Sequence, residues 1–177
     1  MLRSDRSGSG APTLLLLPGL LCTQRLWDRA RPLLEAFHDV LTVDLPGVGG
    51  GDLPEGAADL EAYADRQMPR TFREDAREED VEAALRQARD WPEDAVVRAL
   101  EAMRDRPDHT PLLLEHTELP VLLIQGDDDP TIDALDPEEG HVTRIVTDTA
   151  HMGVLTDPHT FAGIVHGWVA DELERSA

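Results

Sequence analysis

Four short apolar runs, separated by stretches with helical periodicity, most constrain what this chain can fold into. The runs are TLLLLPG (residues 13–19), DVLTVDLPG (39–47), PVLLIQG (120–126) and VTRIVT (142–147). Short apolar runs bounded by Gly, Pro or polar residues are typical of buried strands. Helical periodicity follows the first run from Thr23 to Phe37 and the last run over residues 158–174. Strands alternating with helices predict an α/β fold with a mostly parallel sheet flanked by helices.

Residues 57–106 have a different composition. They are charged and Ala-rich, are interrupted at Pro69 and Pro92, and contain no strand-like run, so they predict two or three amphipathic helices. The Ser- and Gly-rich start predicts a flexible tail over residues 1–12. A chain of 177 residues is long enough for one domain. We therefore expect a single domain over residues 13–177, with 57–106 as a helical insertion.

The charge balance excludes several classes of partner. Asp and Glu number 36 against 16 cations, giving a net charge of -20 that repels nucleic acids and anionic membranes. Every cation is Arg, an acidic composition typical of a salt-tolerant or GC-rich organism. Cys22 has no second cysteine to pair with, which favours a reducing cytoplasm. No apolar run reaches the length of a membrane span.

Four segments together resemble the α/β-hydrolase family. LLLLPGLLCTQRLW, VDLPGVGGGDLP, RPDHTPLLLEHTELPVLLIQGDDDP and TAHMGVLTDPHTF follow one another in the order expected of that family. The resemblance implies a truncated α/β-hydrolase fold, ancestrally that of an ester or acyl hydrolase. It also implies that residues 57–106 correspond to the mobile helical cap over the substrate pocket.

The same resemblance assigns candidate site residues. Asp129, in GDDDP, matches the catalytic acid better than Asp127 or Asp128, and His151, in AHMG, matches the general base. The turn at Gly19 and Leu20 matches the loop that supplies an oxyanion-hole N–H. The alternative interpretation, favoured if the flanking segments are ignored, is that His151 is a solvated loop histidine and Asp129 is one more acidic surface residue.

The candidate pocket residues are apolar. They come from the two site loops and from the cap-like stretch, and each of them has ordinary core packing as its alternative. They are Leu20, Leu21, Trp27, Met68, Phe72, Leu85, Trp91 and Met152.

The nucleophile of the family is missing. No Gly-x-Ser-x-Gly motif occurs, and the serines, all near the termini, are Ser4, Ser7, Ser9 and Ser176. About two strand–helix units therefore lack a counterpart. The GVGGG stretch at 47–51 has Gly49 in the serine's place and predicts a turn. Cys22 is the best remaining nucleophile candidate, because a thiolate beside a histidine can attack an acyl carbon. A cysteine in such a position is, however, more often a half-buried structural residue. Thr131 is a weaker nucleophile candidate than Cys22.

No metal or cofactor is expected. The carboxylates of residues 126–140 do not have the spacing of a calcium-binding EF-hand loop, and the seven histidines have no paired zinc-ligand spacing. Three hypotheses remain open: a weak hydrolase acting on a small ester, a non-catalytic binding or remnant protein, and a fold completed by another chain. Exposed strand edges would favour the third hypothesis, in which the other chain could be a second copy of this one, forming a homo-oligomer.

Two structural expectations follow from the missing units. Strand 13–17 should pair directly, or nearly so, with strand 120–124, because an open gap would leave buried backbone groups unpaired. The reduced core should also give low stability or self-association.

Overall fold

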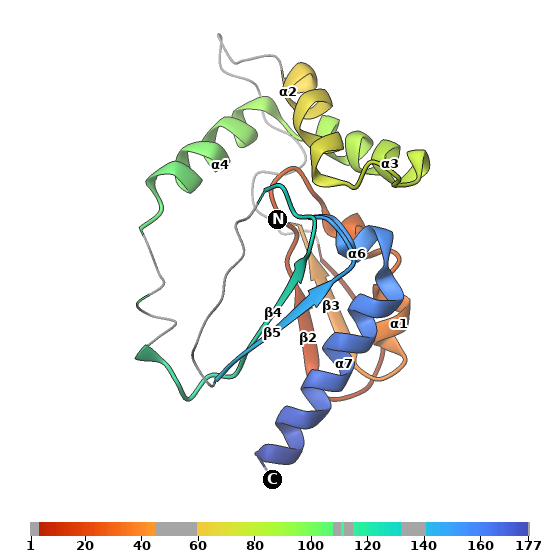
Figure 1. The fold of residues 1–177 in the computed structure, drawn as a ribbon, viewed down its shortest axis with the longest axis vertical. Helices are drawn as coiled ribbons and strands as arrows, with labels where there is room; N and C mark the ends of the chain where they lie inside the picture. Colours follow the sequence, from red (N-terminus) through yellow and green to blue (C-terminus); the bar gives the residue numbers. More distant parts are fainter. Residues whose placement is uncertain (1–3, 45–59, 108–110, 112–114, 132–140, 177) are drawn as a thin grey trace.

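The computed structural model describes residues 4–44, 60–107, 111, 115–131 and 141–176, and their strands form two sheets (Figure 1). In the first, β3 (Asp39–Val43) lies between β1 (Ser4–Ser7) and β2 (Thr13–Leu16). In the second, β4 (Val121–Gly126) pairs with β5 (Val142–Thr147). The β2–β3 and β4–β5 pairs are parallel, and β1 is antiparallel to β3. The predicted mostly parallel α/β architecture is confirmed.

The predicted pairing between strands 13–17 and 120–124 is wrong. β2 pairs with β3 and β4 pairs with β5, so the two segments belong to different sheets. The prediction assumed that the outer edge of β2 would be buried. Instead, β2 is the last strand in the order β1–β3–β2 and Leu15 on it is 56% exposed, so water can bond to the backbone groups at its outer edge. The cost that was expected to force the pairing is therefore small.

The N-terminal segment also differs from its prediction. The expectation of a flexible tail over residues 1–12 is wrong for Ser4–Ser7, which form β1 along the edge of β3. Arg6 donates to Asp39 over 2.6 Å, and Arg31 donates to Asp5 over 2.6 Å. These ion pairs, together with the antiparallel ladder, hold a polar segment that has no apolar face of its own.

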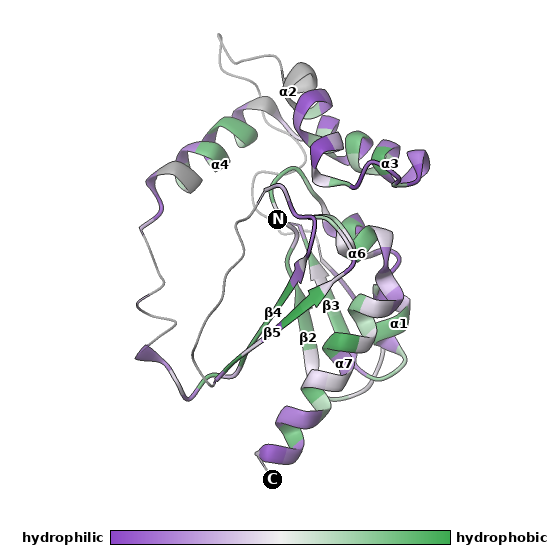
Figure 2. Ribbon diagram, viewed as in Figure 1, coloured by the Kyte–Doolittle hydropathy of each residue, from purple (hydrophilic) through white to green (hydrophobic). Residues whose placement is uncertain are grey.

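Two helices cover one face of the three-stranded sheet. They are α1 (Arg31–Glu35) and α7 (Pro158–Arg175), and α7 agrees closely with the predicted final helix. Pro158 occupies the first turn of α7, and the Asp157 side chain caps it by accepting from the Thr160 N–H. The pattern from Thr23 is divided between a 3-10 helix, η1 (Gln24–Trp27), and α1. Figure 2 shows hydrophobic colouring along much of β2, β4 and β5.

The stretch predicted to be helical forms a layer beyond the strand ends (Figure 1). Within its described part, which begins at residue 60, it contains α2 (Leu60–Gln67), η2 (Met68–Thr71), α3 (Glu78–Arg89) and α4 (Glu93–Asp105). A large core joins this layer to the loop after β2 and to α6 (Gly153–Thr156). Among the described helices, none is both long and apolar enough to cross a membrane.

Polar contacts fasten the helical layer to the rest of the molecule. Asp80 of α3 is 2% exposed and forms ion pairs with Arg29 and Arg77. The Trp91 indole N–H donates to the Cys22 carbonyl over 3.2 Å, and the Met152 N–H donates to the Thr71 carbonyl over 3.1 Å. The helical layer is therefore tied both to the loop after β2 and to the loop that carries His151.

Candidate functional site

The two predicted catalytic side chains lie just beyond the ends of neighbouring strands. Asp129 follows β4 and His151 follows β5, and parallel strands bring their C-terminal ends to the same edge. The His151 Nδ1 lies 3.0 Å from Asp129 Oδ2. The Asp129 side chain is 6% exposed and that of His151 is 33% exposed. The structure thus brings together the acid and the base expected from the resemblance.

Backbone contacts hold these two loops against each other. The Asp127 N–H donates to the Thr147 carbonyl over 2.9 Å, and the Asp128 N–H to the Thr149 carbonyl over 3.2 Å. At Gly126 an added Cβ would lie 2.2 Å from the Thr149 carbonyl oxygen. A side chain would therefore push the loops apart, so glycine is required at this position.

Asp129 is positioned to orient the imidazole. Its Oδ1 accepts a hydrogen bond from the Thr131 N–H over 2.8 Å, which leaves Oδ2 facing His151. When Nδ1 carries the proton and donates a hydrogen bond to Asp129, Nε2 has the free lone pair of a general base. Arg73 forms ion pairs with acidic residues of both loops, since its Nη1 lies 2.5 Å from Asp148 and 3.5 Å from Asp127. This arginine links the two site loops to the helical layer.

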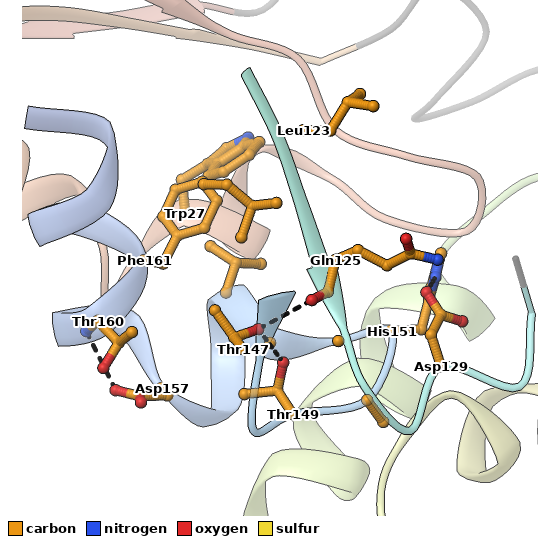
Figure 3. A pocket seen from close by; sticks show the side chains of 15 residues that line it. Trp27, Leu123, Gln125, Asp129, Thr147, Thr149, His151, Asp157, Thr160 and Phe161 are labelled. Atoms are coloured by element: carbon orange, nitrogen blue, oxygen red, sulfur yellow. Dashed lines mark hydrogen bonds and ion pairs between the residues drawn. The ribbon is translucent and has the colours of Figure 1, made fainter. Parts of the chain in front are cut away.

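A cavity of about 260 Å³ adjoins the pair (Figure 3). Trp27 and Phe161 form its apolar wall, with ring centroids 5.9 Å apart. The Thr147 and Thr149 hydroxyls, 2.8 Å apart, add neutral polar groups. The described residues that line it are Trp27, Leu123, Ile124, Gln125, Gly126, Asp129, Thr147, Thr149, Ala150, His151, Gly153, Val154, Asp157, Thr160 and Phe161. Such a cavity can hold a small, largely apolar ligand beside the histidine.

Among the predicted pocket residues, Trp27 lines this cavity. Leu21 and Met152 are 4% and 6% exposed and lie in the core beneath the helical layer, although Met152 also borders a second cavity of about 370 Å³. The same core contains or contacts the other predicted members, which are Leu20, Met68, Phe72, Leu85 and Trp91.

The predicted oxyanion loop is a tight turn outside the cavity lining. Gly19 is exposed and Leu20 is half-buried, and the Cys22 N–H donates to the Gly19 carbonyl over 3.2 Å. Leu21 has φ of 61°, in the left-handed region that is uncommon for a non-glycine residue. Strain of this kind points to a turn that the surrounding structure holds in place.

The alternative nucleophiles are poorly placed. Cys22 is 5% exposed, and burial raises the pKa of its thiol to about 11, so it is protonated at neutral pH. Thr131 is exposed and follows the acid. Ser4 and Ser7 lie in β1, and the Ser176 hydroxyl donates to the Glu172 carbonyl at the end of α7. Neither Cys22, Thr131 nor any of the four serines lines the cavity.

Several sequence features fall outside the described residues. They include the GVGGG stretch at 47–51 and most of the acidic stretch after Asp129. In the parts of the chain that the structure describes, no group of three or more His, Cys, Asp or Glu could hold a metal ion.

Sequence reasoning missed Gln125, Thr147, Thr149 and Phe161 as cavity residues. Gln125 interrupts the apolar run VLLIQG, and the two threonines flank the end of the last strand-like run. A polar residue within or just after a buried strand was the available signal, because parallel strands commonly carry site residues at that end.

No family model matches the sequence. Solved structures nevertheless resemble it along nearly the whole chain. An esterase from Thermogutta terrifontis is 18% identical and has a TM-score of 0.75, with the match covering 96% of this chain and 93% of that one. A bromoperoxidase from Bacillus anthracis is 14% identical (TM-score 0.78; coverage 96% and 95%). An enol-lactonase from Burkholderia xenovorans LB400 is 17% identical (TM-score 0.74; coverage 96% of both chains). Likeness at these identities establishes the fold.

Proposed function

Because the chain has the α/β-hydrolase fold, we propose that it is a hydrolase-related protein that keeps the acid and the base of an ester hydrolase but lacks the serine nucleophile. The observation that carries the proposal is the His151–Asp129 pair, 3.0 Å apart, beside a cavity of about 260 Å³. Its ligand is a small molecule with an ester or related acyl group. No metal or cofactor takes part in the proposed reaction.

Without a serine, water is the proposed nucleophile. His151 Nε2 removes a proton from water while the water oxygen attacks the ester carbonyl, and Asp129 stabilises the imidazolium that forms. The tetrahedral intermediate then expels the alcohol oxygen, which takes the proton back from His151. The products are one carboxylic acid and one alcohol. Turnover is expected to be slow, because the covalent route that divides the reaction into two easier steps is missing.

The test is hydrolysis of p-nitrophenyl acetate by the purified protein, with and without His151. His151→Ala should lower the rate by roughly 100-fold or more, the lower end of what a positioned general base contributes. Asp129→Asn should also lower it, because the imidazole loses its orienting carboxylate. A fluorophosphonate probe should not label the protein, since that probe needs an activated hydroxyl. If neither substitution changes the rate, the pair is a relic and the non-catalytic reading replaces this proposal.

A second candidate function follows from the division of the strands into two sheets. β2 and β4 belong to different sheets, β2 is the edge strand of its sheet, and Leu15 on β2 and Leu17 just after it leave apolar surface exposed. Open edges of this kind pair readily with other strands. We propose that another chain, which in a homo-oligomer is a second copy, covers this edge. Molar mass measured by light scattering over a 100-fold concentration range tests it, and a monomer at every concentration contradicts the homo-oligomer.

A further inference from the structure

Arg144 is a charged side chain in the middle of β5 that the proposed reaction does not use. It is half-buried, and its Nε is enclosed without a hydrogen-bond partner in the described structure. Its Nη2 donates to Gln125 Oε1 over 3.4 Å. Leu123 pairs with Arg144 in the β4–β5 ladder, and Gln125 pairs with Val146. Because side chains alternate along a strand, Arg144 and Gln125 lie on the same face of the sheet.

The other arginines in the described residues follow a different rule. Those that are half-buried, Arg29, Arg31 and Arg73, each have a carboxylate within salt-bridge distance. Those without a carboxylate partner are exposed, and they are Arg25, Arg66, Arg70 and Arg106. Arg144 alone among the described arginines is both half-buried and without an ion pair. The chain has 36 carboxylate side chains for 16 arginines, so a shortage of acidic partners does not explain why Arg144 has no ion pair.

Gln125 connects this unpaired charge to the candidate site. It lines the cavity, and Figure 3 shows its side chain pointing toward the His151–Asp129 pair. Since Arg144 donates to the Gln125 amide oxygen, its guanidinium lies one side chain away from the cavity. Thr147 pairs with Gly126 in the ladder, so its hydroxyl lies on the opposite face of the sheet, and Arg144 is the charged group beside Gln125 on their shared face. A ligand that reaches past Gln125 meets a positive charge there.

We infer that Arg144 binds a carboxylate at the far end of a ligand whose ester group occupies the cavity. The inference rests on the proposed function and names its substrate class: monoesters of short dicarboxylic acids. A partly desolvated guanidinium gains most from an ionised acceptor, and its planar fork matches a carboxylate. Two of the three carboxylates that follow β4 have partners of their own: Asp129 contacts His151 and the Thr131 N–H, and Asp127 lies 3.5 Å from Arg73. The chain's net charge of -20 disfavours anions elsewhere on its surface.

The experiment compares two ligands that differ by one charge. Monomethyl glutarate carries an ester and a carboxylate, whereas dimethyl glutarate carries two esters. Isothermal titration calorimetry at pH 7.5 and matched ionic strength should show the monoester binding at least tenfold more tightly, because a hydrogen bond to a charged group is among the stronger polar contacts. Arg144→Gln should remove that preference and leave binding of the diester unchanged. Arg66→Gln, which removes an exposed arginine without an ion pair, is the matched control and should bind as the parent does.

Binding and hydrolysis are separated by a third variant. His151→Ala should keep the preference for the monoester, so a protein that binds it through Arg144 but does not hydrolyse it supports the inference and contradicts only the proposed reaction. Equal binding of the two ligands, no binding of the monoester at 20 mM, or an unchanged preference in Arg144→Gln overturns the inference. If circular dichroism shows that Arg144→Gln is unfolded, Arg144→Lys replaces it. Lysine keeps the charge and the stem but cannot form the two-pronged contact, so the preference should weaken measurably, and an unchanged preference overturns the inference.

Discussion

Among the residues that the structure describes, the core beneath the helical layer contains 13 that are buried, whereas the core between the three-stranded sheet and its two helices contains three, Leu34, Val40 and Ala162. In an ordinary α/β domain the faces of the sheet bury most of the apolar surface. Here each sheet is narrow, and Leu15 and Leu17 remain more than half exposed. The comparison teaches that the packing of the helical layer onto the site loops holds much of the hydrophobic core of this chain. The sheets position the site residues, but they bury little apolar surface of their own.

The largest expected effect therefore comes from the core beneath the helical layer. Trp91 is 6% exposed, and its indole donates to the Cys22 carbonyl. Trp91→Ala should lower the free energy of unfolding by about 3–5 kcal/mol, measured by urea denaturation. Phe37→Ala is the aromatic control, since Phe37 is 54% exposed and stacks on His166 with ring centroids 4.0 Å apart. It should cost only about 0.5–1.5 kcal/mol. Equal losses would remove the distinction between the two regions.

A smaller loss is expected in the sheet core. Leu34 is fully buried between α1 and the sheet, so Leu34→Ala should lower the free energy of unfolding by about 2–3 kcal/mol. This loss of stability is near the low end for a buried leucine, because the few residues around Leu34 can move into the space that the substitution leaves. Leu33→Ala, on the same helix but half-buried, should cost less. A loss for Leu34→Ala that exceeds the loss for Trp91→Ala would show that the sheet core dominates after all.

The sequence predicts the elements better than their assembly. Apolar runs and helical periodicity locate β2 to β5 and α7, because both signals are local. The two-sheet arrangement is not local: it depends on whether the outer edge of β2 is buried, and nothing within TLLLLPG specifies that. β1 is missed for a related reason, since a polar segment such as SDRS joins a sheet through ion pairs with distant residues, here Arg6 with Asp39.

The candidate site divides in the same way. His151 and Asp129 follow from short motifs placed after strands, and the structure brings them within 3.0 Å. The cavity wall depends on side chains that meet only in three dimensions, such as Phe161 of α7 against Trp27. Leu21 and Met152 flank the site in sequence, yet their side chains turn into the core beneath the helical layer. Proximity in sequence to a site residue therefore does not determine which side of the loop a side chain faces.

A modest effect of pH is expected where α7 meets the sheet. His38 is 3% exposed, and its Nε2 lies 3.1 Å from Nδ1 of His166. Burial and the neighbouring His166 lower the pKa of His38, although the Pro12 and Ala11 carbonyls oppose that shift. The folded state therefore favours neutral His38, so stability should be highest above pH 6.5, the pKa of an unperturbed histidine, and should fall as the pH drops below it.

Urea denaturation between pH 8 and pH 5 measures this dependence. His38→Gln should flatten the part of the decline due to the pair, because glutamine takes no proton. His159→Gln, which alters another histidine of α7, should leave the decline unchanged. A decline of the same size in all three proteins would contradict a role for the His38–His166 pair.

The smallest effect is expected at the open edge of β2. Leu15 is 56% exposed, so Leu15→Thr should change the free energy of unfolding of a monomer by less than about 0.5 kcal/mol. Threonine is chosen because its β-branched side chain is well tolerated in strands. Leu16→Thr is the matched control on the same strand, since Leu16 packs against the sheet core and its replacement should cost more.

The comparison is sharpest as a function of protein concentration. If copies of the chain cover this edge, the loss caused by Leu15→Thr will grow as concentration rises, because the substitution removes apolar surface from an interface that forms only in the oligomer. A constant small loss at every concentration means that water covers the edge, and a large constant loss means that part of the chain itself buries Leu15.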